Sequence, residues 1–465
     1  MKNEFKQETR PDIYRGFQRV LVAQKRIDTA LEVAEQGRYR NVINIFKNYL
    51  GVDFTLHPLI EAPSLEKIKQ IAEKQNTTLV NYSVIYDDNQ LYQAYRFRIS
   101  FNQPYAYATS VFIWVITPSG KITFREVNLK DLWQHKGNPE EPNTSLVGII
   151  RLLRESIGMR NNKESQKTTK KLLQLLYKIL IQPIGDLLPK NPSDRLTFIP
   201  QDFLFLVPFA ALIDSKNKYL IENHTIFTAP SIQFLGLTHQ IIQETKSSEK
   251  SKQALVIGNA TIIKNSENLN KITQTIINFP EIEKEALAVA QILDSPASIG
   301  KEANKTAVLS QLSQSQIIHL ATPCYLDEIE GLRWAITLAP HQSSSLPQLG
   351  EKIFVHEFLT ARDIIKLKLN ASLVALTHCD LHRGKITGDG IIAFSHAFIT
   401  TGIPSILMSL WSIPDAPTAS LMTAFYQNLK NNLDKATALR QAMLKIMQQH
   451  PEPGDWAAFM LIGET

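Results

Sequence analysis

From residue 254 onward, short and continuously apolar segments alternate with amphipathic ones, and this alternation constrains the fold more than any other feature. The apolar segments are ALVIGNA (254–260), IIHLAT (317–322), LRWAITLA (332–339), ASLVALTHC (371–379) and SILMSLW (405–411). Between them, residues 282–293, 305–312, 360–367, 390–401, 416–429 and 435–450 have helical spacing. Apolar strands that alternate with helices indicate a mostly parallel sheet covered by helices on both faces. In such sheets the functional side chains lie at the carboxyl ends of the strands.

The first half of the chain has a different organisation. Residues 14–50 have the spacing of two short amphipathic helices, and residues 62–127 alternate apolar and polar residues, with a turn at Pro118-Ser119-Gly120. Residues 146–188 return to helical spacing. The runs RLTFIP (195–200) and FLFLVPF (203–209) are predicted to form a buried strand pair at a sheet edge, because each carries a proline near its end.

These patterns predict three parts. Residues 1–57 form a helical hairpin, residues 58–245 form a β-rich and helical supporting half, and residues 251–465 form the α/β half that carries the site. The polar stretch KSSEKSK (246–252) is predicted to be the linker.

Composition excludes several classes of protein. The chain has 50 Lys+Arg against 44 Asp+Glu, a net charge of +6, and its densest basic stretch, residues 160–171, has no interleaved aromatic residues. We interpret that stretch as a solvated linker, so nucleic-acid binding is not favoured. Neither an apolar run of about 18 residues nor a signal peptide is present, which predicts a cytoplasmic protein without a membrane partner. No motif for a metal or another cofactor is found.

The two cysteines are the candidate reactive groups. Cys379 follows the apolar strand ASLVALTH, and Cys324 comes shortly after the strand IIHLAT, which is expected to end at Thr322. A cysteine peptidase places a thiol and an imidazole on neighbouring strand ends, because the imidazole activates the thiol and later protonates the leaving amine. The sequence has this arrangement in outline.

The chain resembles the CHAT domain, a caspase-like module related to separase that often follows tetratricopeptide repeats in bacterial proteins. The resemblance is carried by stretches in matching order: ALEVAEQGRYR (30–40), RLTFIPQDFLFLVPFAALID (195–214), YLIENHTIFTAPSIQFL (219–235), ALVIGNA (254–260), FPEIEKEA (279–286), IIHLAT (317–322), LTARDI (359–364), LVALTHCDL (373–381), GDGIIAFSHAFITTGIPSILMSLWSIPD (388–415) and DWAAFMLIGE (455–464). It implies a caspase-like fold and descent from enzymes that hydrolyse peptide bonds through a cysteine thioester.

Two motifs of the family can be compared residue by residue. The family's nucleophile lies in S-A-C-E-T, which here is Thr377-His378-Cys379-Asp380-Leu381, so the resemblance makes Cys379 the nucleophile candidate. The family's general base is the histidine of A-T-H-G, which here is Ala321-Thr322-Pro323-Cys324. Pro323 therefore occupies the position of the catalytic histidine, and proline has no group that can accept a proton.

This departure predicts a peptidase homologue with impaired catalysis that acts in protein–protein regulation. The alternative is an active cysteine endopeptidase with a non-standard base, either His382 in the loop after the thiol or His319 within its strand. We interpret His319 as a hydrogen-bonded core residue. We expect His378 to point away from the thiol of its neighbour Cys379, since consecutive strand residues face opposite sides.

Three further expectations concern the surroundings of Cys379. Asp327 and Asp380 are candidates for binding a basic substrate residue, with ordinary loop carboxylates as the equal alternative. Cys324 and Cys379 are interpreted as two inert thiols, with a redox pair as the alternative. The N-terminal hairpin resembles one tetratricopeptide unit, too few for a binding groove, so the expected partner is a protein or peptide bound elsewhere. The oligomeric state is left open.

Overall fold

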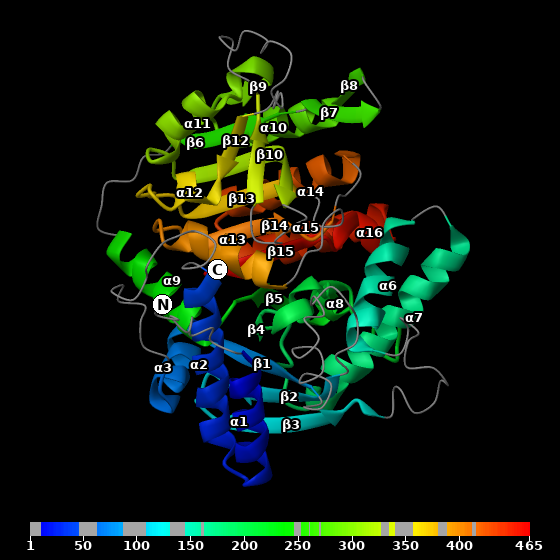
Figure 1. Cartoon of the computed structure of the whole chain (residues 1–465), viewed down its shortest axis with the longest axis vertical. Helices are drawn as coiled ribbons and strands as arrows, with labels where there is room; N and C mark the ends of the chain where they lie inside the picture. Colours follow the sequence, from blue (N-terminus) through cyan, green and yellow to red (C-terminus); the bar gives the residue numbers. More distant parts are fainter. Residues whose placement is uncertain are drawn as a thin grey trace, which may run out of the picture. The chain divides into compact units, whose positions relative to one another are not determined.

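The computed structural model describes most of the chain. The described residues are 11–45, 63–86, 108–130, 145–159, 162–245, 253–259, 261–268, 271–326, 334–339, 357–379, 388–411 and 415–465. They belong to two units (Figure 1), one of Met1–Leu237 with Thr387–Ala393 and one of Thr238–Ile386 with Phe394–Thr465. The predicted three-part division stays a prediction, and the predicted linker at 246–252 lies outside the described residues.

The first unit combines helices with five paired strands. Its elements are α1 (Pro11–Ala23), α2 (Ile27–Ile45), α3 (Leu65–Gln75), β1 (Thr77–Tyr86), β2 (Ala108–Ile116), β3 (Ile122–Asn128), α6 (Leu146–Gly158), α7 (Lys163–Leu180), η2 (Gln182–Ile184), β4 (Arg195–Ile199), η3 (Asp202–Leu206), η4 (Phe209–Ala211), α8 (Leu220–Asn223) and β5 (Thr225–Thr228). Helix α9 (Ile232–Thr245) contains the boundary with the second unit.

The strands of the first unit pair in the order β5-β4-β1-β2-β3. β1 runs parallel to β4, and β4 to β5, whereas β1, β2 and β3 are antiparallel to their neighbours. The β2–β3 hairpin turns at Pro118-Ser119-Gly120, as predicted, and Gly120 has a φ of 78°, which favours glycine. β1 is buried along its whole length, and its polar side chains have partners; Ser83, for example, donates to Gln18 over 2.6 Å.

Two predictions for the first unit were wrong. RLTFIP forms β4, but β4 lies between β1 and β5 rather than at an edge, and FLFLVPF forms the 3₁₀ helices η3 and η4 instead of a strand. Asp202 begins η3 with a φ of 50°, which ends the extended backbone, and Pro208 has no N–H to donate to a sheet. The supposed basic linker is the first half of α7, where Lys163, Lys167, Lys170 and Lys171 are exposed. Lysine favours helices, so the charge pattern marked a solvated helix face.

The predicted N-terminal hairpin is confirmed as α1 and α2, and a buried polar network fixes α2 to the strands of the same unit. Arg38 donates to the carbonyl of Pro200 over 2.5 Å, to the carbonyl of Tyr82, and to Asn81 Oδ1 over 3.1 Å. Glu35 Oε1 lies 3.1 Å from Arg38 Nε. The hairpin is therefore part of the first unit and not an appendage.

The second unit contains the predicted alternation of strands and helices. Its elements are β6 (Ala254–Gly258), β7 (Thr261–Asn268), β8 (Lys271–Asn278), α10 (Pro280–Ile292), β9 (Ala297–Ile299), η5 (Gly300–Glu302), α11 (Lys305–Leu312), β10 (Ile317–Leu326), β11 (Trp334–Leu338), β12 (Glu357–Thr360), α12 (Ala361–Ile364), β13 (Leu373–Cys379), α13 (Gly388–Ile399), β14 (Ser405–Ser409), α14 (Asp415–Lys430), α15 (Lys435–Gln449), α16 (Pro453–Trp456) and β15 (Phe459–Gly463). Helix α13 contains the second boundary between the units.

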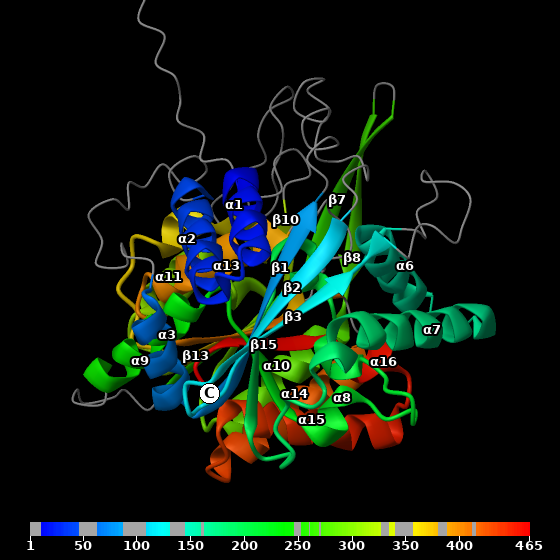
Figure 2. The ribbon, with the colours of Figure 1, turned by 90° about the horizontal axis from the view of Figure 1, so that it is seen from below.

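Five strands of the second unit are parallel, in the order β9-β6-β10-β13-β14. β15 pairs antiparallel with β14, β11 pairs antiparallel with the end of β10, and β12 with β11. Figure 2 shows α11 and α13 on one face of this sheet and α10, α14 and α15 on the other. The predicted α/β class with a mostly parallel sheet is confirmed, and the antiparallel strands make it mixed.

Candidate functional site

The candidate site lies where β10 and β13 run side by side. In the backbone register Pro323 faces His378, and Cys324 faces Cys379. The prediction that the strand of IIHLAT ends at Thr322 was wrong, because β10 continues to Leu326 and its last three residues pair with β11. Pro323 and Cys324 are therefore strand residues rather than loop residues.

A β-bulge interrupts the pairing of these strands just before Pro323. The register shifts between Leu320 and Pro323, so that β10 contributes one residue more than β13. The bulge is held from its other side: the Asn259 N–H donates to Ala321 O over 3.0 Å, and Thr322 Oγ1 donates to the carbonyl of Thr337. A bulge also suits a proline, which cannot donate to a ladder, and bulges are frequent next to active sites.

A fully buried carboxylate contacts one side chain from each of these two strands. Glu285, on α10, receives a hydrogen bond of 2.7 Å at Oε2 from His378 Nε2, and its Oε1 lies 3.1 Å from His319 Nε2. The other ring nitrogen of His319, Nδ1, lies 3.1 Å from the hydroxyl of Tyr426 on α14. Helix α10, strands β10 and β13, and helix α14 thus each contribute one side chain to a single polar cluster.

The cluster stabilises an ionised carboxylate in the interior. Burial alone would raise the pKa of Glu285, but the positive field of His378 and the close contacts of both imidazoles outweigh it and hold the pKa well below its usual range. A buried carboxylate needs a nearby positive charge, since an uncompensated one costs several kcal/mol or more. The imidazoles of His378 and His319 are the groups that lie against the Glu285 carboxylate.

The structure thereby places the predicted candidate base His319 and the neighbour of the thiol, His378, in the same cluster. Both side chains are buried, and the Nε2 atoms of both point to Glu285. His319 packs edge-on against the Tyr426 ring, with the ring centroids 5.5 Å apart. In this arrangement His319 is a partner of Glu285 and Tyr426.

Cys324 is 8% exposed, and its thiol sulfur is disulfide-bonded. The interpretation of the cysteines as two inert thiols was therefore wrong for Cys324. The sequence did not reveal that β10 extends past Thr322, or that the bulge places Cys324 in register with Cys379.

The remaining predicted site residues are not placed. His382, Asp327 and Asp380 lie outside the described residues, and Cys379 is described only through its backbone at the end of β13. Their predicted roles stay predictions.

Sequence reasoning missed Glu285 and Tyr426. The signal for Glu285 was present: on the predicted helix it falls among Ile282, Ala286 and Val289, the residues that α10 buries. A charged residue in the apolar stripe of a helix needs a buried partner. Tyr426 gave no comparable signal, because tyrosine is common in cores.

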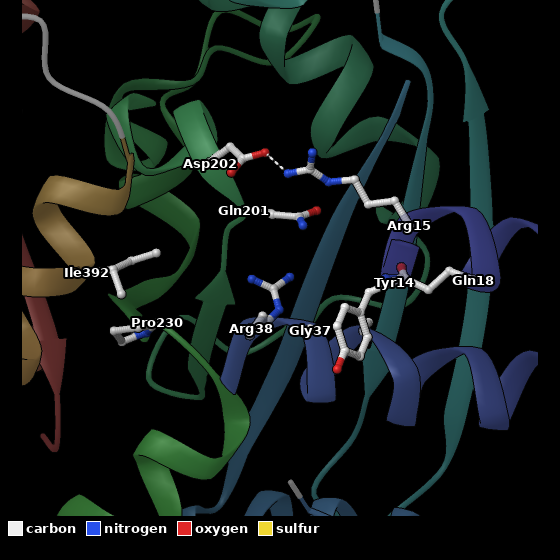
Figure 3. Close-up of a pocket in the computed structure, with 10 residues that line it drawn as sticks. Tyr14, Arg15, Gln18, Gly37, Arg38, Gln201, Asp202, Pro230 and Ile392 are labelled. Atoms are coloured by element: carbon white, nitrogen blue, oxygen red, sulfur yellow. Dashed lines mark hydrogen bonds and ion pairs between the residues drawn. The ribbon is translucent and has the colours of Figure 1, made fainter. Parts of the chain in front are cut away.

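A small cavity in the first unit is not a substrate site. It measures about 30 Å³ and is lined by ten residues, among them Arg15, Arg38, Gln201 and Asp202. Figure 3 shows the Arg15 side chain extended toward Asp202, with which it forms a hydrogen-bonded ion pair, and the Arg38 side chain pointing into the cavity. A volume of this size holds about one water molecule.

Among the described residues, no group of three or more histidine, cysteine, aspartate or glutamate side chains could hold a metal ion. Within the same part of the chain, no helix is long and apolar enough to cross a membrane.

Comparison with known proteins identifies the family of this chain. Residues 170–464, which include both site strands, match the CHAT domain. This chain belongs to the CHAT domain family. Tetratricopeptide repeat protein 28 of Homo sapiens is 30% identical over 337 residues, and its counterpart in Mus musculus is 28% identical over 338 residues. Each alignment covers 63% of this chain but 13% of the relative, so the chain spans only a small part of these relatives' length.

The fold is similar to that of separase. A chain in a crystal structure of the Saccharomyces cerevisiae separase–securin complex superposes with a TM-score of 0.51 and 10% identity, covering 98% of this CHAT chain and 36% of the other. The predicted caspase-like fold is thereby confirmed. The chain thus carries a CHAT domain and has a separase-like fold.

Proposed function

We propose that this CHAT protein has lost peptidase activity and acts by binding a protein or peptide partner. The observation that carries the proposal is the position of Pro323, which stands in register with His378, one residue before the Cys324–Cys379 pair. This is the strand position at which the family resemblance expects the catalytic imidazole. A proline there can neither lower the pKa of a thiol nor protonate a leaving amine.

The neighbouring histidines support the same proposal. To serve as a general base, His319 would have to leave both Glu285 and Tyr426, and His378 would have to leave Glu285. Either movement would leave a buried carboxylate with less compensation, which is costly. His382 is then the base that an active enzyme would have to use.

Peptide binding is the part of the ancestral activity that does not need the imidazole. Asp327 and Asp380 remain proposed contacts for a basic residue, because carboxylates pair well with Arg and Lys. The protein would then bind segments that a relative cleaves.

The test compares three reduced proteins on peptides with Arg or Lys before the scissile bond: the wild type, Cys379→Ser, and the double variant Pro323→His/Cys324→Gly, which restores the family motif. We expect no hydrolysis by the wild type beyond that of Cys379→Ser. A peptide that the double variant cleaves should bind to the wild type and remain intact, as measured by calorimetry and mass spectrometry. Hydrolysis by the wild type that disappears in Cys379→Ser would overturn the proposal and favour His382 as the base.

A further inference from the structure

The β-bulge at the site determines which residue stands opposite Cys379. Over the pairs from Ile317↔Leu373 to Leu320↔Leu376, the partner's number exceeds that of the β10 residue by 56. After the bulge the difference is 55, so Cys324 faces Cys379. With an uninterrupted register, position 324 would face position 380, an aspartate.

Contacts on the far side of β10 fix this register. Asn259, directly after β6, donates from its backbone N–H to Ala321 O over 3.0 Å and from Nδ2 to Thr337 O over 3.2 Å. Cys324 itself pairs with Ile336 of β11 in the backbone register. The position of Cys324 is thus set by strands on both sides.

Register partners on neighbouring parallel strands lie about 4.8 Å apart and share one face of the sheet. This spacing is within the Cα–Cα range of about 4.4–6.8 Å that a disulfide spans. Cys324 is disulfide-bonded, and Cys379 is the only other cysteine of the chain.

We propose that Cys324 and Cys379 form a reversible disulfide, so that the candidate nucleophile is a site of thiol–disulfide exchange with small thiols and disulfides. Pro323 removes the base of the peptidase, and Cys324 supplies a resolving thiol in the adjacent position. Both departures from the family motif then change the chemistry of one residue, Cys379. This inference goes beyond the proposed loss of peptidase activity, because it concerns the oxidation state of the site.

The exchange balances with a low-molecular-weight disulfide such as oxidised glutathione. The thiolate of one cysteine attacks a sulfur of that disulfide, forming a mixed disulfide and releasing one glutathione thiolate. The thiolate of the other cysteine then attacks the protein sulfur of the mixed disulfide and releases the second glutathione. Two protein thiols are oxidised, one glutathione disulfide is reduced to two thiols, and a small dithiol reverses the reaction.

The test is a redox titration of the folded chain in mixtures of reduced and oxidised glutathione. After acid quenching and alkylation, mass spectrometry counts the free thiols, and digestion identifies the cross-linked peptides. We expect an oxidised form lighter by two hydrogen atoms, with residues 324 and 379 joined within one chain. Dithiothreitol should return the protein to two alkylatable thiols without unfolding it.

The single variants Cys324→Ser and Cys379→Ser are the matched controls. Each should accumulate the mixed disulfide with glutathione, because no second thiol can resolve it. Two alkylatable thiols in the wild type under oxidised glutathione would overturn the proposal, and so would a disulfide that dithiothreitol reduces only after denaturation. Neither outcome depends on peptidase activity, so failure here is distinct from failure of the proposed function.

Discussion

Glu285 is the residue on which the interior of the site depends most. It is the carboxylate that both His319 and His378 contact, and it belongs to a helix rather than to either site strand. The carboxylate joins α10 to β10 through His319 and to β13 through His378. Glu285 therefore acts as a positioning residue for these two strands.

Removing this carboxylate should destabilise the second unit strongly. Glu285→Ala leaves the buried His378 without its hydrogen-bond acceptor, and a buried polar group that loses its partner typically costs about 1–3 kcal/mol. Glu285→Gln should cost less, because an amide oxygen still accepts a hydrogen bond. Urea unfolding at neutral pH measures both; equal stability of wild type and Glu285→Ala would contradict the assigned role.

The acid stability of the protein should depend on the same residue. The pKa of Glu285 is lowered on folding, so its ionisation stabilises the native state above the unfolded value of about 4.3. That contribution is lost as the pH falls toward the folded pKa. The difference in unfolding free energy between wild type and Glu285→Gln should therefore shrink on acidification from pH 7 to pH 3. An increase of this free-energy difference toward acidic pH would contradict a pKa of Glu285 that is lowered on folding.

The sequence predicted the site residues that lie in family motifs, and it missed the residue that only tertiary packing brings to the site. Cys379, Pro323 and Cys324 are adjacent to recognisable motif positions. Glu285 is 93 positions before His378 in the chain and reaches it only through the packing of α10 on the sheet. Only its charge within an apolar stripe could have been noticed in advance.

Among the elements, the turn from α13 to β14 has the strictest backbone requirement. Gly402 has a φ of 102°, and a Cβ at this position would lie 2.8 Å from the backbone oxygen of Leu369. The Leu369 N–H donates to Thr401 O over 2.7 Å, so this backbone cannot easily withdraw. This turn therefore requires a glycine.

Gly402→Ala should therefore destabilise the protein more than Gly300→Ala, its matched control. Gly300 also has a positive φ, 52°, but no atom within 4 Å of the added Cβ. The control should lose about 1 kcal/mol for the left-handed conformation, and Gly402→Ala a further ~1–3 kcal/mol for the clash. Urea unfolding of both variants checks the order, which equal losses would contradict.

Elements with a clear period were predictable, and those decided by tertiary context were not. The strands β6 and β14, for example, were predicted from short apolar runs, and both are buried along their whole length. FLFLVPF is equally apolar, but the backbone at Asp202 and Pro208 makes it 3₁₀ helix. The β7–β8 hairpin was not predicted, because its strands TIIKNSEN and KITQTIIN contain many polar residues, as loops do.

For the molecule as a whole, the N-terminal hairpin matters as part of the first unit. Glu35 accepts from the Ile232 N–H and from Asn81, both over 2.7 Å, while Arg38 donates to the carbonyls of Pro200 and Tyr82. The hairpin thus supplies buried structural contacts to its own unit.

Arg38→Met should destabilise the first unit by about 3–5 kcal/mol, because Glu35 would remain buried without its cation. Arg40→Met is the control, since Arg40 is exposed on the same helix and should change stability by less than about 0.5 kcal/mol. Urea unfolding, followed by tryptophan fluorescence, measures both. An Arg38→Met protein as stable as the control would show that the network is dispensable.

If the reduced site holds a thiol without a base, Cys379 should alkylate like a free cysteine. The measurement is the rate of its reaction with iodoacetamide across pH 5–10 in the reduced Cys324→Ser variant, where Cys379 is the only thiol. We expect this rate to rise with pH through the range of an ordinary thiol, around 8.5. A rate already at its plateau at or below neutral pH would reveal a thiolate paired with an imidazole and would show that the site has a base.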